Sequence, residues 1–395
     1  MAGAAALVVA LTLGAEAQVD AGVRLEATAR RLEPPAVPGE ERSLDLTASP
    51  RLALRVASGE ATLRASYFPR FAARGVGRHV RAERMHEGEV RLELTRGAPF
   101  RLEVFGTAAA GRTDLVSEIE SGTTPGTGAS TILRTEQIDL ERLRAGGSLS
   151  LAPSRRLELL LTGAVGRDGG TDARSREIHP PARTLESSAE LRWRATRLDQ
   201  VGLQLAGTQA RIAALRADAG WGSALATWRH RLSPRTEAWS GAGAVAMTSR
   251  VPDPEAGGTR TSAEQVAPAA QLGVQRTGSE PLDTTVALSG ELGATMDRAT
   301  GRATRGLDAR ASLRWPWSRV VALTGNGTGS VTWGDAGRIR TGHLELGASF
   351  TLTRRVQLGL AGFGTWQRAE DPAAARVDSY GATLGLSLEA PPLRP

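Results

Sequence analysis

The chain has 395 residues, with 49 basic and 42 acidic side chains and a net charge of +7, and every basic residue is an arginine. It contains no cysteine, which excludes a disulfide scaffold, a thiolate zinc site and a cysteine nucleophile. The arginines are spread singly along the chain and are not interleaved with stacking aromatics, so the basic charge does not indicate nucleic-acid binding.

An apolar stretch covers residues 4–13 and is followed by Ala15-Glu16-Ala17, a small-residue cleavage pattern. This predicts that residues 1–17 are a secretory signal peptide cleaved near Ala17-Gln18, although no basic residue precedes the apolar stretch. The alternative is a buried N-terminal helix. No later stretch is long and apolar enough to predict a membrane-spanning helix. An exported protein of this composition belongs in the periplasm, in the outer membrane or outside the cell.

From Gln18 onward the dominant pattern has a period of two residues. In 89–95, valine and leucine alternate with glutamate, arginine and threonine. Such alternation predicts strands with one apolar and one polar face. It recurs in 51–57, 60–67, 307–315 and 343–352, and it is less clear in 221–232 and 237–248, where Gly and Ala occupy both faces.

Short turns alternate with longer polar links, and the step from one short turn to the next is commonly about 40 residues. Outer-membrane barrels show this asymmetry, with short periplasmic turns, long outer loops and strands of roughly ten residues. The short turns fall at 49–51, 96–99, 152–154, 233–235, 316–318 and 353–355, and the links at 112–134, 168–183, 249–262, 297–304, 334–340 and 368–377.

We therefore expect an all-β fold, a transmembrane antiparallel up-and-down β-barrel formed by residues 18–395 as a single domain. At about 20 residues per strand and connection, the mature chain gives about 18 strands, with 16 to 20 allowed. A soluble sandwich of this length would need several domains, each with its own large core, whereas the apolar face here is lean. A barrel of this width leaves an aqueous channel unless something plugs it.

The polar faces of these strands are expected to line the lumen, where rings of charge set pore selectivity. The alternative role for each such residue is ion pairing across strands. His343 is expected on this face near Glu345, and the excess of arginine predicts a mild anion preference. The lumen candidates are Arg24, Arg55, Arg64, Arg91, Arg101, Arg192, Arg194, Arg310, Arg314, Glu89, Glu93, Glu190 and Glu345.

The few aromatic residues lie mostly near predicted strand ends. Indole and phenol rings at strand ends are typical of the girdles at the two membrane interfaces, because such rings combine an apolar body with a polar group. The alternative is packing in a soluble β-sandwich core. The girdle candidates are Tyr67, Phe71, Trp193, Trp239, Trp315, Trp333 and Trp366.

No nucleotide-binding or catalytic motif is present, so we expect neither an enzyme nor a cofactor. His79 and His86 with Glu83 and Glu87 could be a metal cluster, but a solvated outer loop is the simpler interpretation. Residues 168–172, DGGTD, resemble a fragment of a calcium loop with too few ligands. We therefore expect no metal site.

Two segments carry a family resemblance. Ser49-Pro50-Arg51-Leu52 and Tyr67-Phe68-Pro69-Arg70-Phe71 resemble elements in early hairpins of the outer-membrane barrels found with exopolysaccharide secretion systems of myxobacteria. The resemblance implies a barrel that carries polymer across the outer membrane together with a periplasmic polysaccharide export protein. One departure concerns the C-terminus, because the last predicted strand runs on into residues 389–395 without a terminal aromatic.

We thus expect an outer-membrane channel that passes a hydrophilic polymer, most specifically secreted exopolysaccharide. Its partners would be outer-membrane lipid and polysaccharide or small hydrophilic solutes, and no nucleic acid. The alternatives are a general diffusion porin and a plugged structural or adhesive barrel, with an outer-membrane enzyme last.

Overall fold

The computed structural model describes residues 16–34, 41–76, 79–97, 99–116, 129–130, 136–252, 260–278, 284–298, 300–334, 337–370 and 376–393. Most of the predicted leader lies outside these residues. The elements are β1 (Glu16–Glu33), β2 (Arg42–Ser58), β3 (Ala61–Tyr67), β4 (Arg70–Val76), β5 (His79–Thr95), β6 (Phe100–Thr113), β7 (Ala129–Ser130), β8 (Ile138–Leu151), β9 (Leu157–Gly170), α3 (Ala173–Ile178), β10 (Ala182–Arg194), β11 (Asp199–Ile212), β12 (Ala217–Ser233), β13 (Thr236–Pro252), β14 (Arg260–Arg276), β15 (Thr285–Asp297), β16 (Ala303–Pro316), β17 (Val321–Gly334), β18 (Gly337–Thr353), β19 (Val356–Ala369) and β20 (Val377–Glu389).

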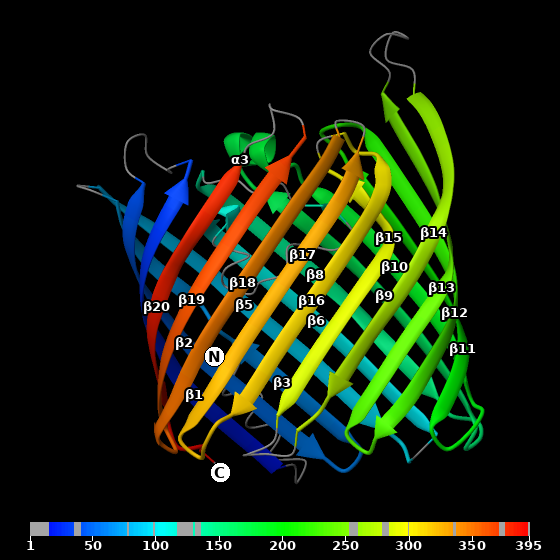
Figure 1. The fold of residues 1–395 in the computed structure, drawn as a ribbon, viewed down its shortest axis with the longest axis horizontal. Helices are drawn as coiled ribbons and strands as arrows, with labels where there is room; N and C mark the ends of the chain where they lie inside the picture. Colours follow the sequence, from blue (N-terminus) through cyan, green and yellow to red (C-terminus); the bar gives the residue numbers. More distant parts are fainter. Residues whose placement is uncertain are drawn as a thin grey trace.

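The strands form a closed barrel, because β1 pairs with both β2 and β20 (Figure 1). β3 and β4 follow one another at a single position between β2 and β5. β7 joins the sheet only as a short parallel partner of β15. The sheet has 20 strands, but β7 is not part of the wall, and β3 and β4 share one position. The wall therefore has 18 strand positions, and all pairings between them are antiparallel. The predicted all-β barrel of about 18 strands is confirmed.

The strands are longer than the ten or so residues expected from the alternation. Apart from the divided β3 and β4, the wall strands run from 13 to 18 residues. They are strongly tilted (Figure 1), and a tilted strand needs more residues to cover the same height. The predicted link 334–340 is consequently mostly strand, since β17 reaches Gly334 and β18 begins at Gly337.

The apolar side chains of the wall point outward. Leu46, Leu344 and Leu360 are more than half exposed, which would be unusual on a water-soluble protein. β1 begins and β20 ends at the lower end of Figure 1, the end that carries the short turns. Among the described residues, no helix is long and apolar enough to cross a membrane.

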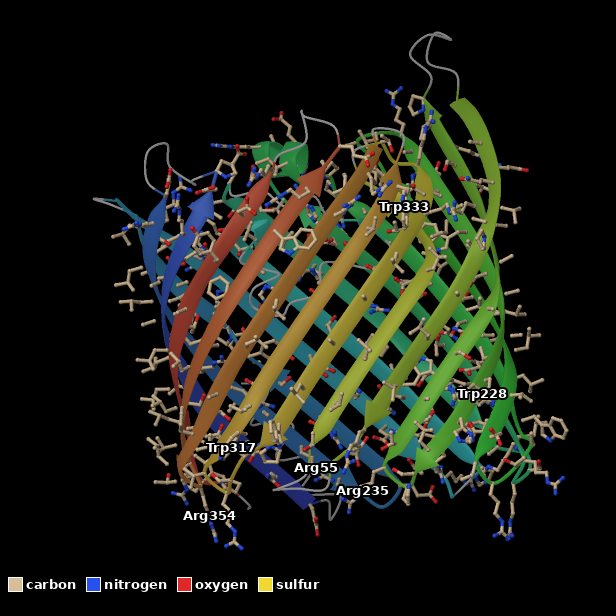
Figure 2. All side chains as sticks on the ribbon, in the orientation of Figure 1. Arg55, Trp228, Arg235, Trp317, Trp333 and Arg354 are labelled. Carbon is tan, nitrogen blue, oxygen red and sulfur yellow. The ribbon has the colours of Figure 1, made fainter. Side chains whose placement is uncertain are left out.

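The structure places four of the predicted girdle residues on the outer face near strand ends: Trp193, Trp315, Trp333 and Trp366, all of them exposed. Figure 2 shows Trp333 near the upper end and Trp317 near the lower end, so two belts are present. Further aromatic residues, which were not among the seven girdle candidates, are also exposed: Trp228, Trp317 and Tyr380.

Three girdle candidates occupy other places. Tyr67 and Phe71 point outward but flank the break between β3 and β4, halfway along that strand position. Trp239 is wrong as a girdle residue, because its indole lies inside the barrel against the backbone of Gly273. The two-residue period of β13 is masked by Gly and Ala on both faces, so the sequence did not reveal which face Trp239 shares.

Candidate functional site in the lumen

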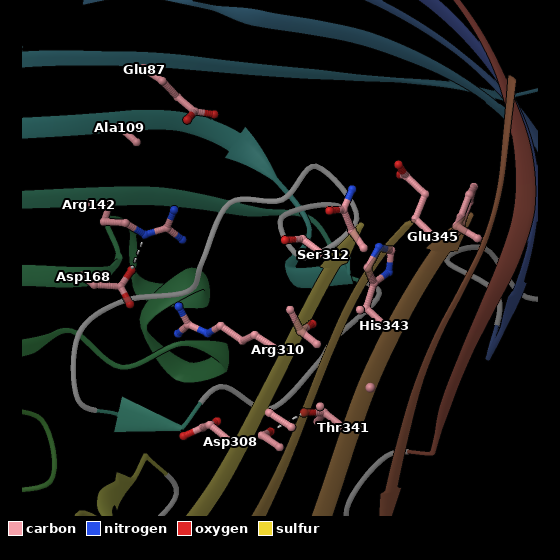
Figure 3. A pocket seen from close by; sticks show the side chains of 18 of the residues that line it. Glu87, Ala109, Arg142, Asp168, Asp308, Arg310, Ser312, Thr341, His343 and Glu345 are labelled. Atoms are coloured by element: carbon pink, nitrogen blue, oxygen red, sulfur yellow. Dashed lines mark hydrogen bonds and ion pairs between the residues drawn. The ribbon is translucent and has the colours of Figure 1, made fainter. Parts of the chain in front are cut away.

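The lumen holds a cavity of about 1500 Å³ that is lined from almost every side of the wall. The side formed by β16, β17 and β18 is rich in hydroxyl and amide groups, among them Ser312, Asn326 and Thr341. Charged residues such as Asp308 and Arg310 lie among them, and the other sides also carry charge. Figure 3 shows Arg142 and Asp168 on one wall, and the hydroxyl-rich side with Ser312 and Thr341 across the cavity from them. The cavity therefore offers hydrogen-bonding groups over most of its surface.

All the predicted lumen residues lie on the inward face of their strands. The register places Arg55, Arg64 and Arg91 side by side on β2, β3 and β5, for example. Only some of these residues reach the cavity, namely Arg24, Glu89, Arg310 and Glu345. The others lie nearer the short-turn end; they are Arg55, Arg64, Arg91, Arg101, Arg192, Arg194, Arg314, Glu93 and Glu190.

Several of these residues form ion pairs, some within one strand and others between neighbouring strands. Arg91 contacts Glu89 at 2.8 Å and Glu103 at 3.1 Å. On the far side of the wall, Arg192 contacts Glu190 at 2.6 Å. Exposed or half-exposed pairs of this kind stiffen the wall only weakly, because water and salt screen them. The alternative role of wall pairing thus holds for these residues, and their effect on selectivity stays a prediction.

A buried ionic cluster near the long-link end escaped the sequence prediction. Arg74 on β4 reaches Asp45 at 3.1 Å, Glu83 at 2.9 Å and Asp114 at 2.5 Å. Arg30 on β1 shares Asp45 at 2.8 Å. All five side chains are buried. In the sequence, Asp114 falls in a predicted link and Glu83 in a segment interpreted as an outer loop, and only the tertiary structure brings them together with Arg74.

Asp114 belongs to the link between β6 and β8, of which the structure describes 114–116, 129–130 and 136–137. Its residues Leu115 and Val116 are buried, and farther along the link, β7 pairs with Met296 and Asp297 of β15. β15 lies on the opposite side of the wall from β6 and β8. Since the link starts at one wall and adds a strand to the other, its described residues narrow the upper lumen.

A second buried cluster joins the wall to the β15–β16 turn. Arg298 in that turn forms an ion pair with Asp168 on β9 and donates to the carbonyl of Pro180 at 3.0 Å. His179 contacts the same Asp168 carboxylate at 3.2 Å. Burial, and next the positive charge of Arg298, hold the pKa of His179 below its ordinary value. Arg142 is a further, longer contact of Asp168 at 3.6 Å.

The structure gives the 168–172 segment a role other than calcium binding. Asp168 is committed to Arg298 and His179. Asp172 caps α3, its carboxylate accepting hydrogen bonds from the hydroxyl of Ser175 at 2.6 Å and from its backbone N–H at 2.9 Å. These hydrogen bonds lower the pKa of Asp172 to about 2.

The structure also shows where His86 and His343 point. Glu83 and Glu87 face the lumen, whereas His86 faces outward and contacts the Tyr67 hydroxyl at 2.6 Å. The imagined metal cluster is therefore divided between two faces, and no metal-binding group occurs within the described part of the chain. His343 lines the cavity as expected, with Nδ1 at 2.8 Å from the Thr365 hydroxyl.

The charge balance of the cavity differs from that of the chain. Its described lining includes eight arginines and ten carboxylates. Many of the chain's other arginines lie at the short-turn end, where Figure 2 shows Arg235 and Arg354. The excess of arginine in the sequence therefore gives no support to an anion preference of the cavity itself.

No protein-family model and no curated protein matches this chain. Solved structures of similar fold include the FrpB iron transporter from Neisseria meningitidis, with a TM-score of 0.48 and 12% identity over 89% of this chain and 64% of FrpB. OccK9 of Pseudomonas aeruginosa has a TM-score of 0.45 and 15% identity, covering 95% of this chain and 98% of OccK9. The ferric-catecholate import receptor Fiu from E. coli K12 has a TM-score of 0.47 and 8% identity, covering 95% of this chain and 81% of Fiu. The chain thus spans less than two thirds of the length of FrpB.

Proposed function

We propose that this protein is an outer-membrane channel for hydrophilic solutes. The observation that carries the proposal is the closed barrel with an apolar exterior and a polar, charged cavity inside. Closure leaves no sheet edge along most of the wall, which a lipid environment requires. The two belts of exposed tryptophan match the two interfaces of a bilayer.

The orientation follows from the connections. The short turns, the start of β1 and the end of β20 all lie at the same end of the barrel. In outer-membrane barrels this end faces the periplasm. The longer links, α3 and β7 then belong to the outer side. The leader expected at residues 1–17 agrees with export, and its cleavage can be checked by N-terminal sequencing of the membrane-extracted protein.

A saccharide is the solute class that the cavity favours. Its hydroxyl-rich side can exchange hydrogen bonds with sugar hydroxyls, and the balanced charges would not exclude a neutral solute. The resemblance at Ser49–Leu52 and Tyr67–Phe71 points to secreted exopolysaccharide, with a periplasmic export protein as partner. A polymer would require the link residues and the β15–β16 turn to move aside, whereas small solutes require less.

Planar-bilayer recording of the purified protein tests the channel. Stepwise conductance is expected, and an absence of any conductance would favour the plugged structural or adhesive barrel. A deletion strain separates the two channel versions. Loss of surface polysaccharide with normal uptake of small sugars supports polymer export, while slower sugar uptake with unchanged polysaccharide supports a general porin.

A further inference from the structure

The barrel wall is incomplete between β14 and β15. Their ladder runs only from Arg276↔Val286 to Ala270↔Leu292. On its other side β14 stays paired with β13 as far as Pro252↔Arg260, and this hairpin rises above its neighbours (Figure 1). Within the described residues, the edge of 260–269 that faces β15 therefore has no strand partner. We call this break, together with the side chains that close it, the seam.

Pro268 accounts for the place where the ladder stops. Successive residues of a strand direct their backbone groups to opposite neighbours. Thr277, at the end of β14, donates its N–H to the carbonyl of Arg235 beside β13 at 2.9 Å. Pro268 lies an odd number of residues earlier, so its backbone faces β15. Proline has no N–H to donate, and it is tolerated in sheets chiefly at such edges.

Above the seam, the ends of β15 and β16 turn into the lumen. Met296 and Ala303 belong to the outward-pointing set of their strands, yet they pack with Ile212, which points inward from β11. The backbone N–H of Ala303 also donates to the Ser249 hydroxyl on the inner face of β13, at 2.8 Å. The hairpin tip therefore lies inside the wall and overlaps β12 and β13.

Glycine and arginine hold this tip in place. Gly301 has φ +70° and lies so close to Ala217 that a Cβ would collide with it. Arg298 reaches across to Asp168 on β9. The tip is thus fastened at its turn by an ion pair, and along the seam by apolar contacts and the Ala303–Ser249 hydrogen bond, where a β14–β15 ladder would otherwise run.

An apolar strip joins the cavity to the seam. Trp221 lines the cavity and packs against Val245, Met247, Ala267 and Ala269, all on inward faces of β13 and β14. This strip differs from the charged and hydroxylated surface around the rest of the cavity. Next to it, Val266 is 74% exposed on the outer face of β14.

We propose that the seam is a lateral portal through which a long-chain amphiphile passes between the lumen and the outer leaflet, with the β15–β16 tip as its door. The strip receives the apolar chain while the polar cavity receives the head group. Because no β14–β15 ladder runs along the seam, opening it breaks no hydrogen bonds between wall strands. It does separate the side-chain packing and the Ala303–Ser249 hydrogen bond, and the two-residue pairing of β15 with β7 moves with the tip or is broken. The inference rests on the proposed membrane position of the barrel, but not on the identity of the hydrophilic cargo.

The test uses the absence of native cysteine. The variant Ser249→Cys/Ala303→Cys puts two thiols on the residues joined by the hydrogen bond from the Ala303 backbone to the Ser249 side chain. Oxidation to a disulfide, checked by the mass of the intact protein, locks the tip against β13. The matched control is Thr162→Cys/Ser188→Cys, a lumen-facing pair at 2.7 Å within the intact β9–β10 ladder. The probe is hexadecanoate carrying a photoactivatable diazirine, added to lipid vesicles that contain the protein.

After illumination, mass spectrometry locates the labelled residues. Labelling of Met247 and Ala267 is expected in the reduced variant, and at least a five-fold loss is expected on oxidation, with no loss in the control pair. The variant Arg298→Ala, which releases the turn, should raise the same labelling, and this second variant covers a failure of the first to fold.

The proposal is overturned if Met247 and Ala267 are labelled equally in locked and unlocked protein. It is also overturned if only the outward Val266 and Leu272 are labelled in both states. The salt conductance of the same protein preparation is recorded in a separate experiment. If the protein conducts ions but the seam is not labelled, the portal proposal is wrong and the channel proposal stands. If the seam is labelled but the protein does not conduct, the hydrophilic channel is wrong and the portal stands.

Discussion

At the scale of single residues, the alternation of side chains predicted which face each charge occupies. Arg91 and Glu93, for instance, point inward as expected. Burial was not predictable in the same way, because Arg74 has the same local pattern as Arg91 but is buried among three carboxylates. The difference arises from neighbours on strands far away in the sequence.

Arg74 should therefore matter far more to stability than an ordinary lumen arginine. Arg74→Ala leaves Asp45, Glu83 and Asp114 buried without their shared cation, and is expected to destabilise the barrel by about 3–5 kcal/mol. The matched control is Arg101→Ala, whose exposed pair with Glu93 is worth about 0–1 kcal/mol. Urea unfolding in detergent micelles measures both. Equal losses would mean that the buried cluster is not a structural anchor.

His179 should make stability depend on pH. In the unfolded chain a histidine titrates near pH 6.5, and burial lowers the pKa of His179 in the folded protein. The folded state thus favours the neutral ring, so its contribution is complete above about pH 6.5 and is lost as the pH falls toward the lower folded value. Asp168, Arg298 and Arg142 face this ring and set the balance.

The urea midpoint should therefore fall more steeply below about pH 6.5 in the native sequence than in His179→Gln. The glutamine keeps a polar group beside Asp168 but does not titrate. Parallel curves for the two proteins would show that protonation of His179 does not act on the fold.

At the scale of elements, the strands with charged faces could be predicted, and the Gly- and Ala-rich ones only in part. β16 and β18 follow their predicted alternation closely. In β13 the inward direction of Trp239 could not be predicted, because its neighbours are small on both faces of the strand. Pro268 is visible in the sequence, but which neighbour its backbone faces depends on the register of β13, β14 and β15.

The β15–β16 tip offers an element-scale prediction based on two glycines. Gly301→Ala and Gly59→Ala both place a side chain at positive φ, which costs about 1–2 kcal/mol. A Cβ at Gly301 would also collide with Ala217, whereas nothing lies within 4 Å of the Cβ position at Gly59. We expect Gly301→Ala to lose roughly 1–3 kcal/mol more than Gly59→Ala, from overpacking. Urea midpoints of the two variants decide this, and a smaller loss at Gly301 would show that the tip is not packed against Ala217.

At the scale of the whole molecule, the lumen has its own charge balance. Its eight arginines and ten carboxylates predict weak selectivity with a slight preference for cations. Glu291→Gln/Asp308→Asn removes two facing carboxylates and should move the reversal potential in asymmetric salt toward anions. The control Glu93→Gln/Glu158→Gln removes two lumen carboxylates outside the cavity and should have less effect. A strong anion preference in the native channel would contradict this assignment.

By itself, the sequence determined the barrel, because the two-residue alternation and the asymmetry of turns and links are properties of neighbouring residues along the chain. The count of about 18 strands follows from length and the same local period. Only the tertiary structure decided how the lumen is shaped. The Arg74 cluster, the clasp of Arg298 on Asp168, the position of β7 and the seam beside Pro268 each join strands that are distant in the sequence. Pairing register and the bending of a hairpin into the lumen bring them together, and neither leaves a periodic mark in the chain.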